Sequence, residues 1–481
     1  MIGGVDVRGG AFGEAVPSQD SARSAGLSVE VEEEVYRYQD AGNGANALWC
    51  SGSSCLVRIG NDLFASGIEV IPHAKPLNNC RWLLFQRTAS GWRLWHKDLR
   101  ERTREPCPLV GFSGGRLLQS VNPARTTPDA YSGPAEPQLL EFSAADPVAP
   151  PKVWSPRWSA AVVFTEHSYR NLAVDRERGE LIVFHNLNYD GAYWSFLDHQ
   201  GAWSARGHLL WPVGEHYHPP QPLRLCYYNV FLDDRAAYVW GASDTAEPVD
   251  SWKKFKFELS GQEWAYVFRY VFFSWTPDVT CEPFRPWLEI ANVEPTAGYV
   301  RNCDLWVSSD GAAHLLWLEH DRYFIGVRNF PTPRADDIEQ RFHEKFFPHR
   351  RRTYTLNYAV LREGQVVGKW VLARGGEESS QLVEIPKWGR FQVLPDGRLF
   401  VFFSVDILLD GANSFTENRC LEIQPNGDVG GAMKLPLRHP FTEYFFTATP
   451  RAGSPPSNMM ELLGECRDEP RTVRYARIQV G

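Results

Sequence analysis

The sequence predicts an all-β fold, a seven-bladed β-propeller of four-stranded antiparallel blades. Three observations lead to this prediction. The chain has 481 residues and is rich in aromatic residues, with 18 Trp, 18 Tyr and 28 Phe between frequent turn formers, 39 Gly and 34 Pro. Helical periodicity is almost absent. Short apolar runs that follow an Asp- or Gly-containing turn recur about every 50 residues, a period typical of propeller blades.

The recurring turn is clearest in the middle of the chain, where an Asp precedes four or five apolar residues. The four copies are VDRERGELIVFHN (174–186), LDDRAAYVWGAS (232–243), SSDGAAHLLWLEH (308–320) and LPDGRLFVFFSVD (394–406), with Asp175, Asp234, Asp310 and Asp396 in the turns. Each copy has an apolar strand before the turn and one after it, and a Trp-bearing strand usually follows. Weaker copies lie near Gly60 and Gly114, and a last strand set closes the chain, which gives about seven units. A sandwich of two sheets is the structural competitor, but it does not explain the repeated turn.

The domain organisation follows from composition. Residues 1–28 are rich in Gly, Ser and Ala and are expected to be disordered, whereas 29–481 form one propeller domain. An insert at about 321–352 interrupts one blade, and within it Arg334 to Phe347 has the periodicity of a short amphipathic helix. We expect this insert to form a lid or a wall of a binding subsite. The N-terminus has no basic segment followed by an apolar one, so the protein is cytoplasmic or a presequence is absent, and localisation stays open.

Composition also excludes several classes of protein. No apolar run approaches the ~20 residues that cross a bilayer, so no membrane span is expected. A net charge of −8 argues against nucleic acid and anionic membranes as partners. The nine cysteines are odd in number and form no C-x-x-C pair, which favours reduced core thiols. The hydrolase, phosphate-loop, zinc-protease and dinucleotide motifs are all missing.

The repeat allows polar residues at corresponding strand ends to be aligned. In a propeller the innermost strands converge on one axis, so these ends should face a shared pocket. Eight residues before each turn Asp stand His167, Cys226, Asn302 and Trp388; past each apolar run stand His185 and Asn186, Ser243 and Asp244, Glu319 and His320, and Ser404 and Asp406. The densest cluster, in the third and fourth units, combines His, Tyr and Arg. This combination suits β-elimination next to a carboxylate, which needs a cation, a base and an acid.

A metal site is the less favoured interpretation. His216 and His218 would share one face of an extended strand, with Cys226 or Cys281 as further ligands, but no third ligand lies at close spacing. No cofactor is therefore certain, and a structural divalent metal is left open.

The segment HSYRNLAVDRERGELIVFHN (167–186), followed by AYWSFLDHQGAW (192–203), resembles the BNR-repeat (sialidase-like) seven-bladed propellers. That group includes lyases acting on ulvan and on rhamnosyl-glucuronate linkages, and a related rhamnosidase family. The resemblance implies a His and a Tyr as base and acid, and an Arg or a second His that neutralises the uronate carboxylate. The arginine triad and the Tyr–Glu pair of sialidases cannot be placed, which argues against sialidase activity.

The resemblance implies roles for His167, His185, Tyr228 and Arg301, and the aligned strand ends and their cluster add Tyr169, Asn186, Asp244 and Trp388. His167, His185 and Tyr228 are the expected catalytic residues; Arg301, Tyr169, Asn186, Asp244 and Trp388 are the expected substrate-binding residues. Because Tyr227 and Tyr228 alternate faces of a strand, at most one of them can face the channel.

Three functions compete at this point. The first is a polysaccharide lyase that cleaves uronate-containing glycans by β-elimination, with an oligo- or polysaccharide as the partner. The second is a glycoside hydrolase that uses two carboxylates drawn from Glu166, Asp244, Asp304 and Glu319. The third is a non-catalytic propeller that binds glycans or proteins, since one fold hosts many functions.

Overall fold

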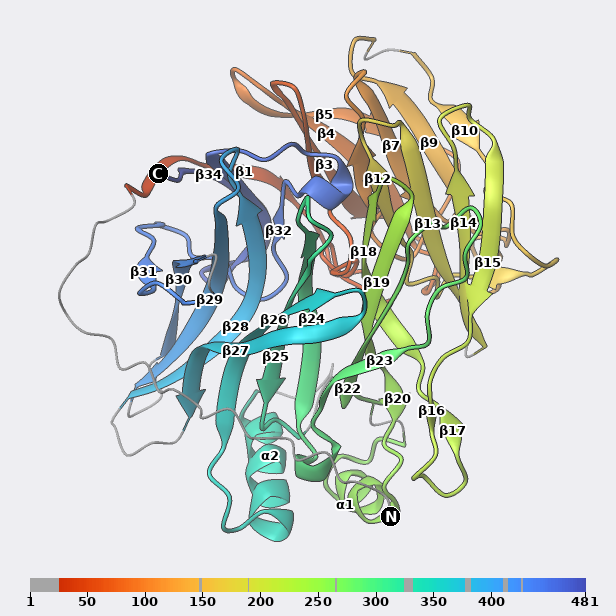
Figure 1. Cartoon of the computed structure of the whole chain (residues 1–481). Helices are drawn as coiled ribbons and strands as arrows, with labels where there is room; N and C mark the ends of the chain where they lie inside the picture. Colours follow the sequence, from red (N-terminus) through yellow and green to blue (C-terminus); the bar gives the residue numbers. More distant parts are fainter. Residues whose placement is uncertain are drawn as a thin grey trace, which may run out of the picture.

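The computed structural model describes residues 26–146, 149–188, 190–263, 266–323, 332–376, 382–409, 414–424 and 427–481. It is an all-β protein with seven four-stranded antiparallel blades arranged as a β-propeller, which confirms the predicted fold class (Figure 1). The expected disordered segment 1–28 lies outside the described residues except for its last three positions.

Each blade runs from an innermost to an outermost strand. The first three blades are β2 (Leu56–Ile59), β3 (Asp62–Val70), β4 (Cys80–Thr88) and β5 (Gly91–Lys97); β6 (Leu109–Gly111), β7 (Arg116–Val121), β9 (Gln138–Ser143) and β10 (Lys152–Trp154); and β12 (Asn171–Asp175), β13 (Glu180–Leu187), β14 (Gly191–Leu197) and β15 (Trp203–Leu209). The fourth and fifth are β18 (Leu225–Asp233), β19 (Ala236–Ser243), β22 (Tyr270–Thr276) and β23 (Leu288–Asn292); and β24 (Tyr299–Val307), β25 (Ala313–His320), β26 (Thr353–Arg362) and β27 (Gln365–Gly376). The sixth is β28 (Leu382–Val393), β29 (Leu399–Leu409), β30 (Ser414–Ile423) and β31 (Met433–Lys434).

The seventh blade joins the two ends of the described chain. It consists of β32 (Phe446–Thr447), β33 (Met459–Cys466), β34 (Glu469–Gln479) and, as its outermost strand, β1 (Ser28–Arg37), which pairs antiparallel with β34. This pairing ties the start of the propeller to its end, so the ring of blades closes through backbone hydrogen bonds.

Two-stranded ribbons and short helices complete the fold. The ribbons pair β8 (Pro134–Ala135) with β11 (Phe164–Thr165), β16 (Val213–Gly214) with β17 (Gln221–Pro222), and β20 (Thr245–Ala246) with β21 (Tyr266–Val267). Short 3₁₀ helices span Glu294–Thr296 and Pro450–Ala452.

The hydrophobic core lies between neighbouring blades. Inner strands such as β18 and β19 are buried along nearly their whole length, because each is covered by a blade on both faces. Large aromatic side chains fill these layers; Trp240 of the fourth blade meets Trp317 of the fifth edge to face at 6.4 Å. The many Trp and Phe residues of the sequence therefore serve mainly to pack blades together.

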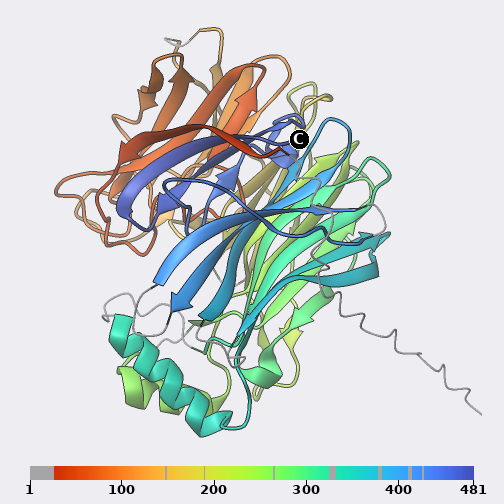
Figure 2. The same cartoon turned by 90° about the vertical axis from the view of Figure 1, so that its left-hand side faces the viewer.

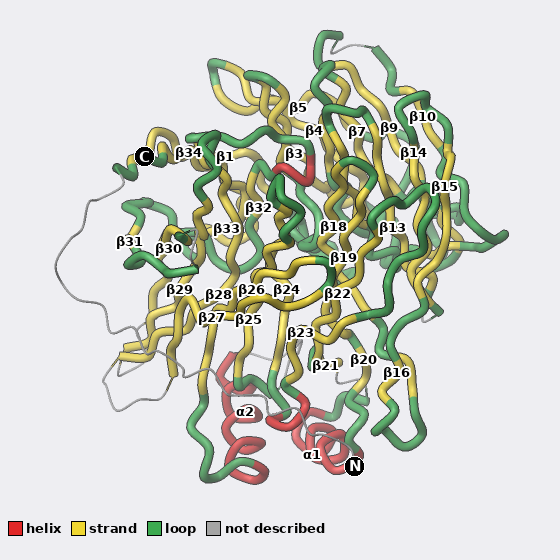
Figure 3. Tube along the Cα trace, viewed as in Figure 1, coloured by secondary structure: helices red, strands yellow, loops and turns green. Residues whose placement is uncertain are grey.

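Two α-helices stand side by side at one end of the propeller (Figures 2 and 3). Helix α1 (Asp250–Ser260) is inserted between β19 and β22, and helix α2 (Thr332–Phe346) between β25 and β26. They pack through aromatic residues, with Phe255 5.5 Å from Phe346 and Trp252 6.2 Å from Phe342 between ring centroids. The structure therefore contains the helix predicted within the insert. Helix α1 was not predicted, although Trp252, Phe255 and Leu259 recur at helical spacing in its sequence.

The cysteines are free thiols, and all of them except Cys281 are buried. Within the described ranges, no helix is long and apolar enough to span a membrane.

Candidate active site

The end of the propeller that carries α1 and α2 is where the inner strands begin and the second strands end. Leu225 at the start of β18 pairs with Ser243 at the end of β19, and Tyr299 at the start of β24 pairs with His320 at the end of β25. The insertions that hold the two helices leave from these same ends. The strand ends aligned from the sequence therefore do share one face of the molecule.

Four side chains form a continuous arc across this face, from the third blade to the fifth. The ring of His167 lies 6.5 Å from that of Tyr169, and Tyr169 lies 5.1 Å from Tyr227. The guanidinium of Arg301 stacks 3.5 Å from the centre of the Tyr227 ring. Tyr444, beside β32, completes the group at 5.8 Å from Arg301. We call this set of five residues the axial mouth.

Backbone strain is concentrated at the axial mouth. Tyr169, Tyr227 and Tyr444 all have positive φ, at 41°, 57° and 58°. Bulky residues rarely adopt this conformation, and each instance costs of order 1–3 kcal/mol. For Tyr227 the cause is a bulge in β18 between Cys226 and Asn229. Three strained tyrosines, each at the start of a different inner strand, indicate a functional site.

Arg301 is a buried cation without a carboxylate partner. It is 3% exposed, its Nη2 donates to Ser51 Oγ at 2.8 Å, and its Nε has no hydrogen-bond partner. In the described part of the chain no carboxylate forms an ion pair with it, because the nearby Asp244 is held by Arg224 at 2.8 Å. An unpaired buried charge costs several kcal/mol, and an anion beside this guanidinium would offset that cost.

Tyr169 and Tyr227 offer free hydroxyl groups. Neither hydroxyl makes a hydrogen bond among the described residues, although Tyr227 as a whole is only 4% exposed. Burial raises the pKa of each phenol well above its usual value; Asp244 adds to the effect at Tyr169, whereas Arg301 opposes it at Tyr227. Both phenols are therefore protonated at neutral pH in the unliganded protein.

His167 stands at the outer end of the arc with 38% of its side chain exposed. Its Nδ1 lies 2.7 Å from Nη1 of Arg104, which is itself 3.3 Å from Glu105 Oε1. An arginine can only donate, so Nδ1 must accept, and the proton of the neutral imidazole sits on Nε2. This Nε2 lies 3.8 Å from Glu166 Oε1.

His185 and Tyr228, both predicted to be catalytic, are buried behind the mouth. His185 is 1% exposed and is enclosed by the rings of Trp158 and Phe164, at 5.4 and 5.5 Å. Burial lowers its pKa well below the usual value, with a further contribution from Arg170, so it is neutral. Tyr228 is fully buried, and its hydroxyl accepts a hydrogen bond from Trp211 Nε1 at 2.9 Å. The β18 bulge gives the position at the mouth to Tyr227 instead.

The remaining predicted binding residues are committed to contacts within the protein. Asn186 donates to the Leu225 carbonyl at 2.8 Å, and Trp388 donates to the Phe445 carbonyl at 3.2 Å. Asp244 is paired with Arg224, as described above. These three residues link neighbouring blades or brace the mouth from behind, whereas Tyr169 and Arg301 lie within it.

The carboxylates considered for hydrolysis are not brought together as a pair. Asp304 is buried between Arg451 at 3.0 Å and Arg390 at 3.7 Å, and it also accepts two backbone N–H groups. Glu166 is buried and receives the Gly133 N–H, whereas Glu319 lies on β25 and accepts from Trp317 Nε1 at 2.7 Å. Each of these carboxylates has a structural partner.

A different pair of carboxylates does share a cation. Lys387 Nζ lies 2.5 Å from Glu443 and 3.1 Å from Asp406. The charge of Lys387 lowers the pKa of Glu443 to about 2, so this group is ionised and cannot act as a proton donor.

Metal ligands do not cluster in the described ranges, where no group of three or more His, Cys, Asp or Glu residues could hold an ion. The Nε2 of His216 lies 3.0 Å from the Tyr270 hydroxyl.

Sequence reasoning missed Trp49, Arg104 and Tyr444. Trp49 packs edge to face on Tyr227 at 5.6 Å, and Arg104 and Tyr444 have the roles given above. All three precede innermost strands, of the first, second and seventh blades. The repeated turn is weak or absent in these blades, so no alignment of strand ends could identify them.

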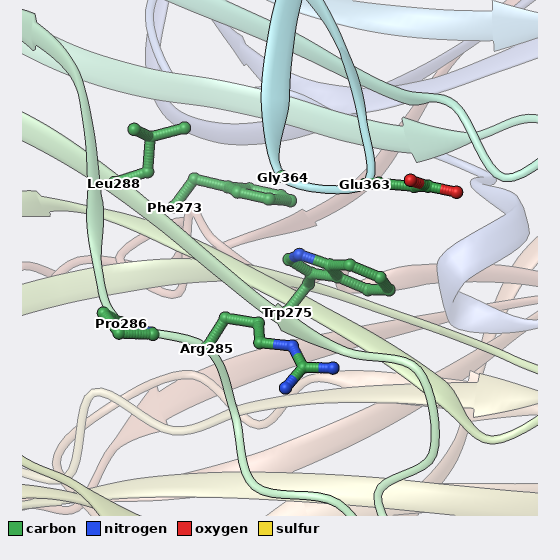
Figure 4. Close-up of a pocket in the computed structure, with 7 residues that line it drawn as sticks. All are labelled: Phe273, Trp275, Arg285, Pro286, Leu288, Glu363 and Gly364. Atoms are coloured by element: carbon green, nitrogen blue, oxygen red, sulfur yellow. The ribbon is translucent and has the colours of Figure 1, made fainter.

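A separate hollow lies away from the mouth, where the outer strands of the fourth and fifth blades meet. Figure 4 shows Trp275 and Arg285 below the Glu363–Gly364 turn, and Phe273 and Leu288 to its left. None of the residues predicted for the site lines it.

Comparison with known proteins supports the fold. No protein-family model matches the chain, and no curated protein matches its sequence. A polysaccharide lyase, an ulvan lyase bound to -[GlcA(1-4)Rha3S]-, is similar with a TM-score of 0.51 at 8% identity, over 94% of this chain and 96% of that one. A protein of unknown function from Dyadobacter fermentans has a TM-score of 0.44 at 10% identity, over 95% of this chain and 100% of that one. A Penicillium chrysogenum α-L-arabinanase has a TM-score of 0.38 at 9% identity, over 94% of this chain and 98% of that one. At 8% identity the likeness to the ulvan lyase shows a shared fold alone.

Proposed function

We propose that this protein is a carbohydrate-active enzyme, a polysaccharide lyase that cleaves a uronate-containing glycan by β-elimination at the axial mouth. The observation that carries the proposal is the buried guanidinium of Arg301, which has no carboxylate partner and lies against a tyrosine with a free hydroxyl. The likeness in fold to an ulvan lyase and the resemblance of residues 167–203 to BNR-repeat propellers are consistent with it.

The order of side chains along the mouth suits the order of atoms in a uronate. A sugar carboxylate bound by Arg301 places the neighbouring α-carbon near Tyr227, and the next carbon, which bears the leaving oxygen, toward Tyr169 and His167. The guanidinium neutralises the carboxylate and so makes the α-proton more acidic.

Tyr227 is the proposed acid–base residue. Its phenol first loses its proton to solvent, which becomes more frequent as the pH rises. The phenolate then takes the α-proton, the electrons of the C–H bond form the new carbon–carbon double bond, and the bond to the leaving oxygen breaks. The same phenol then gives its proton to that oxygen, so the tyrosine returns to its starting state. Arg104 fixes the His167 proton on Nε2, where it donates a hydrogen bond to the leaving sugar rather than acting as the base.

The test is the ultraviolet absorbance of the unsaturated uronate product, measured on a panel of uronate-containing polysaccharides. Tyr227→Phe should abolish the signal, whereas Tyr228→Phe, one residue away but turned into the core, should keep it. Loss of activity in both variants, or in neither, would contradict the assignment.

A glycoside hydrolase is the alternative, which would release reducing ends without the unsaturated product. It would direct attention to Asp406 and Glu443, yet Glu443 is held ionised by Lys387 and supplies no acid. Binding of uronate glycans without turnover would favour the non-catalytic propeller.

A further inference from the structure

The loop that leads into the first blade crosses the propeller axis and holds the floor of the mouth. Its Ser51 accepts from Arg301 through Oγ and from Arg390 through its carbonyl, at 2.8 and 2.7 Å. The Gly52 carbonyl accepts from Arg451 at 2.6 Å and from Asn229 at 2.9 Å. We call residues 50–55 the axial loop.

Gly52 is packed without space for a side chain. A Cβ there would fall against the carbonyl oxygens of Tyr227 and Tyr228. The axial loop therefore touches both the cation and the tyrosine of the proposed site.

Two cysteines stand at the ends of this loop with their sulfur atoms in close contact. Cys50 Sγ lies 3.1 Å from Cys55 Sγ, and a tight turn, in which Ser53 N donates to the Cys50 carbonyl at 2.9 Å, brings the two together. A disulfide needs a separation of about 2.05 Å, so a movement of about 1 Å would join them. Among the described residues no other pair of thiols is in hydrogen-bonding contact.

We propose that Cys50 and Cys55 are a disulfide-forming pair that locks the axial loop beneath the mouth. The oxidant is a small disulfide such as oxidised glutathione. One thiolate attacks it and releases one glutathione thiol; the second cysteine then displaces the other glutathione, so two thiols are oxidised as one disulfide is reduced to two thiols.

Burial affects the rate of this reaction in the folded protein. It raises the pKa of Cys50 well above the usual value, which leaves little thiolate to react. Exchange should therefore be slow in the native state and rapid during folding, before the loop is covered.

The experiment maps thiols in the full chain after equilibration with, and after refolding in, mixtures of oxidised and reduced glutathione. Alkylation and peptide mass analysis should show a Cys50–Cys55 link and two fewer reactive thiols per chain. The oxidised protein should melt about 2 °C higher than the reduced one, as expected for closing so short a loop in a domain of this size. Cys55→Ser should lose both effects, whereas Cys420→Ser, which removes a buried thiol that makes no hydrogen-bonding contact with another thiol among the described residues, should keep them.

The result is independent of the proposed lyase activity, because thiol mapping needs no substrate. Absence of the link after refolding, a link from Cys50 to another cysteine such as Cys107, or equal oxidation of all buried thiols would overturn the proposal. If the link forms and the melting temperature does not rise, the loop is not locked and the proposal fails as well.

Discussion

Replacing Arg301 by methionine should separate ligand binding from stability. A guanidinium that binds a carboxylate in a buried site contributes about 3 kcal/mol to affinity, within a range of 2–5. Since each 1.4 kcal/mol is a factor of ten, Arg301→Met should weaken binding of a uronate oligosaccharide about 100-fold.

Stability should respond differently, because Arg301 has no carboxylate partner to lose. Its desolvation costs several kcal/mol. This cost is offset by stacking on Tyr227, which contributes up to about 2 kcal/mol, and by the hydrogen bond to Ser51, about 1.5–3 kcal/mol. Methionine removes the desolvation cost of the guanidinium together with its stacking and its hydrogen bond, so the free energy of unfolding should stay within about 1 kcal/mol of the wild type.

Arg390→Met is the matched control. Arg390 is equally buried, but it faces Asp304 at 3.7 Å and donates to the carbonyls of Phe445 and Ser51 at 3.0 and 2.7 Å. Its removal leaves the Ser51 carbonyl without this donor and takes one of two guanidinium groups from the buried Asp304, so it should cost about 3 kcal/mol of stability.

Titration calorimetry with a uronate oligosaccharide and chemical denaturation measure the two quantities. The reasoning is refuted if Arg301→Met binds the oligosaccharide like the wild type, or if it destabilises the protein as much as Arg390→Met does.

Three further predictions follow from the same geometry. If the Tyr227 phenolate is the base, its raised pKa means that the reactive form becomes more abundant as pH increases, so turnover should rise steadily from pH 7 to about 10; a rate that falls over this range contradicts the role. His185→Leu should retain activity, and it should flatten the acid side of the stability curve. Below about pH 6.5 the unfolded chain takes up a proton that folded His185, with its lowered pKa, does not take up, which lowers the free energy of unfolding of the wild type by up to about 1.4 kcal/mol per pH unit. Equal dependence of the free energy of unfolding on pH for variant and wild type, measured by denaturation at pH 5 to 7, would argue against this. Gly52→Ala should lower the free energy of unfolding by about 2–4 kcal/mol, because the added methyl group meets two carbonyl oxygens; an unchanged denaturation midpoint would show that the axial loop is freer than described.

The sequence was informative wherever the blades repeat. The turns at Asp175, Asp234, Asp310 and Asp396 each join a first strand to a second one, and counting them with their weaker copies gave seven blades. Because the strands of successive blades run in the same sense, residues at equivalent positions had to gather at one end of the axis.

Arg301 and the pair Tyr227/Tyr228 show where that reasoning stopped. Alternation along β18 required that only one of the two tyrosines face the axis, but it could not show which, since a bulge of one residue reverses the choice. The charge of Arg301 is plain in the sequence, whereas its lack of a carboxylate partner depends on every neighbour in three dimensions.

Local pattern alone thus determined the all-β class, the blade repeat, the amphipathic helix of the insert and the face on which polar strand ends meet. Only the tertiary structure decided that β1 closes the ring, that the axial loop supports the mouth, and that His167 and Tyr227 rather than His185 and Tyr228 belong to the mouth. The physical reason is that periodicity is a property of neighbours along the chain. Closure, burial and the pairing of charges depend on contacts between residues hundreds of positions apart, such as those of Arg301 with Ser51 and of β1 with β34.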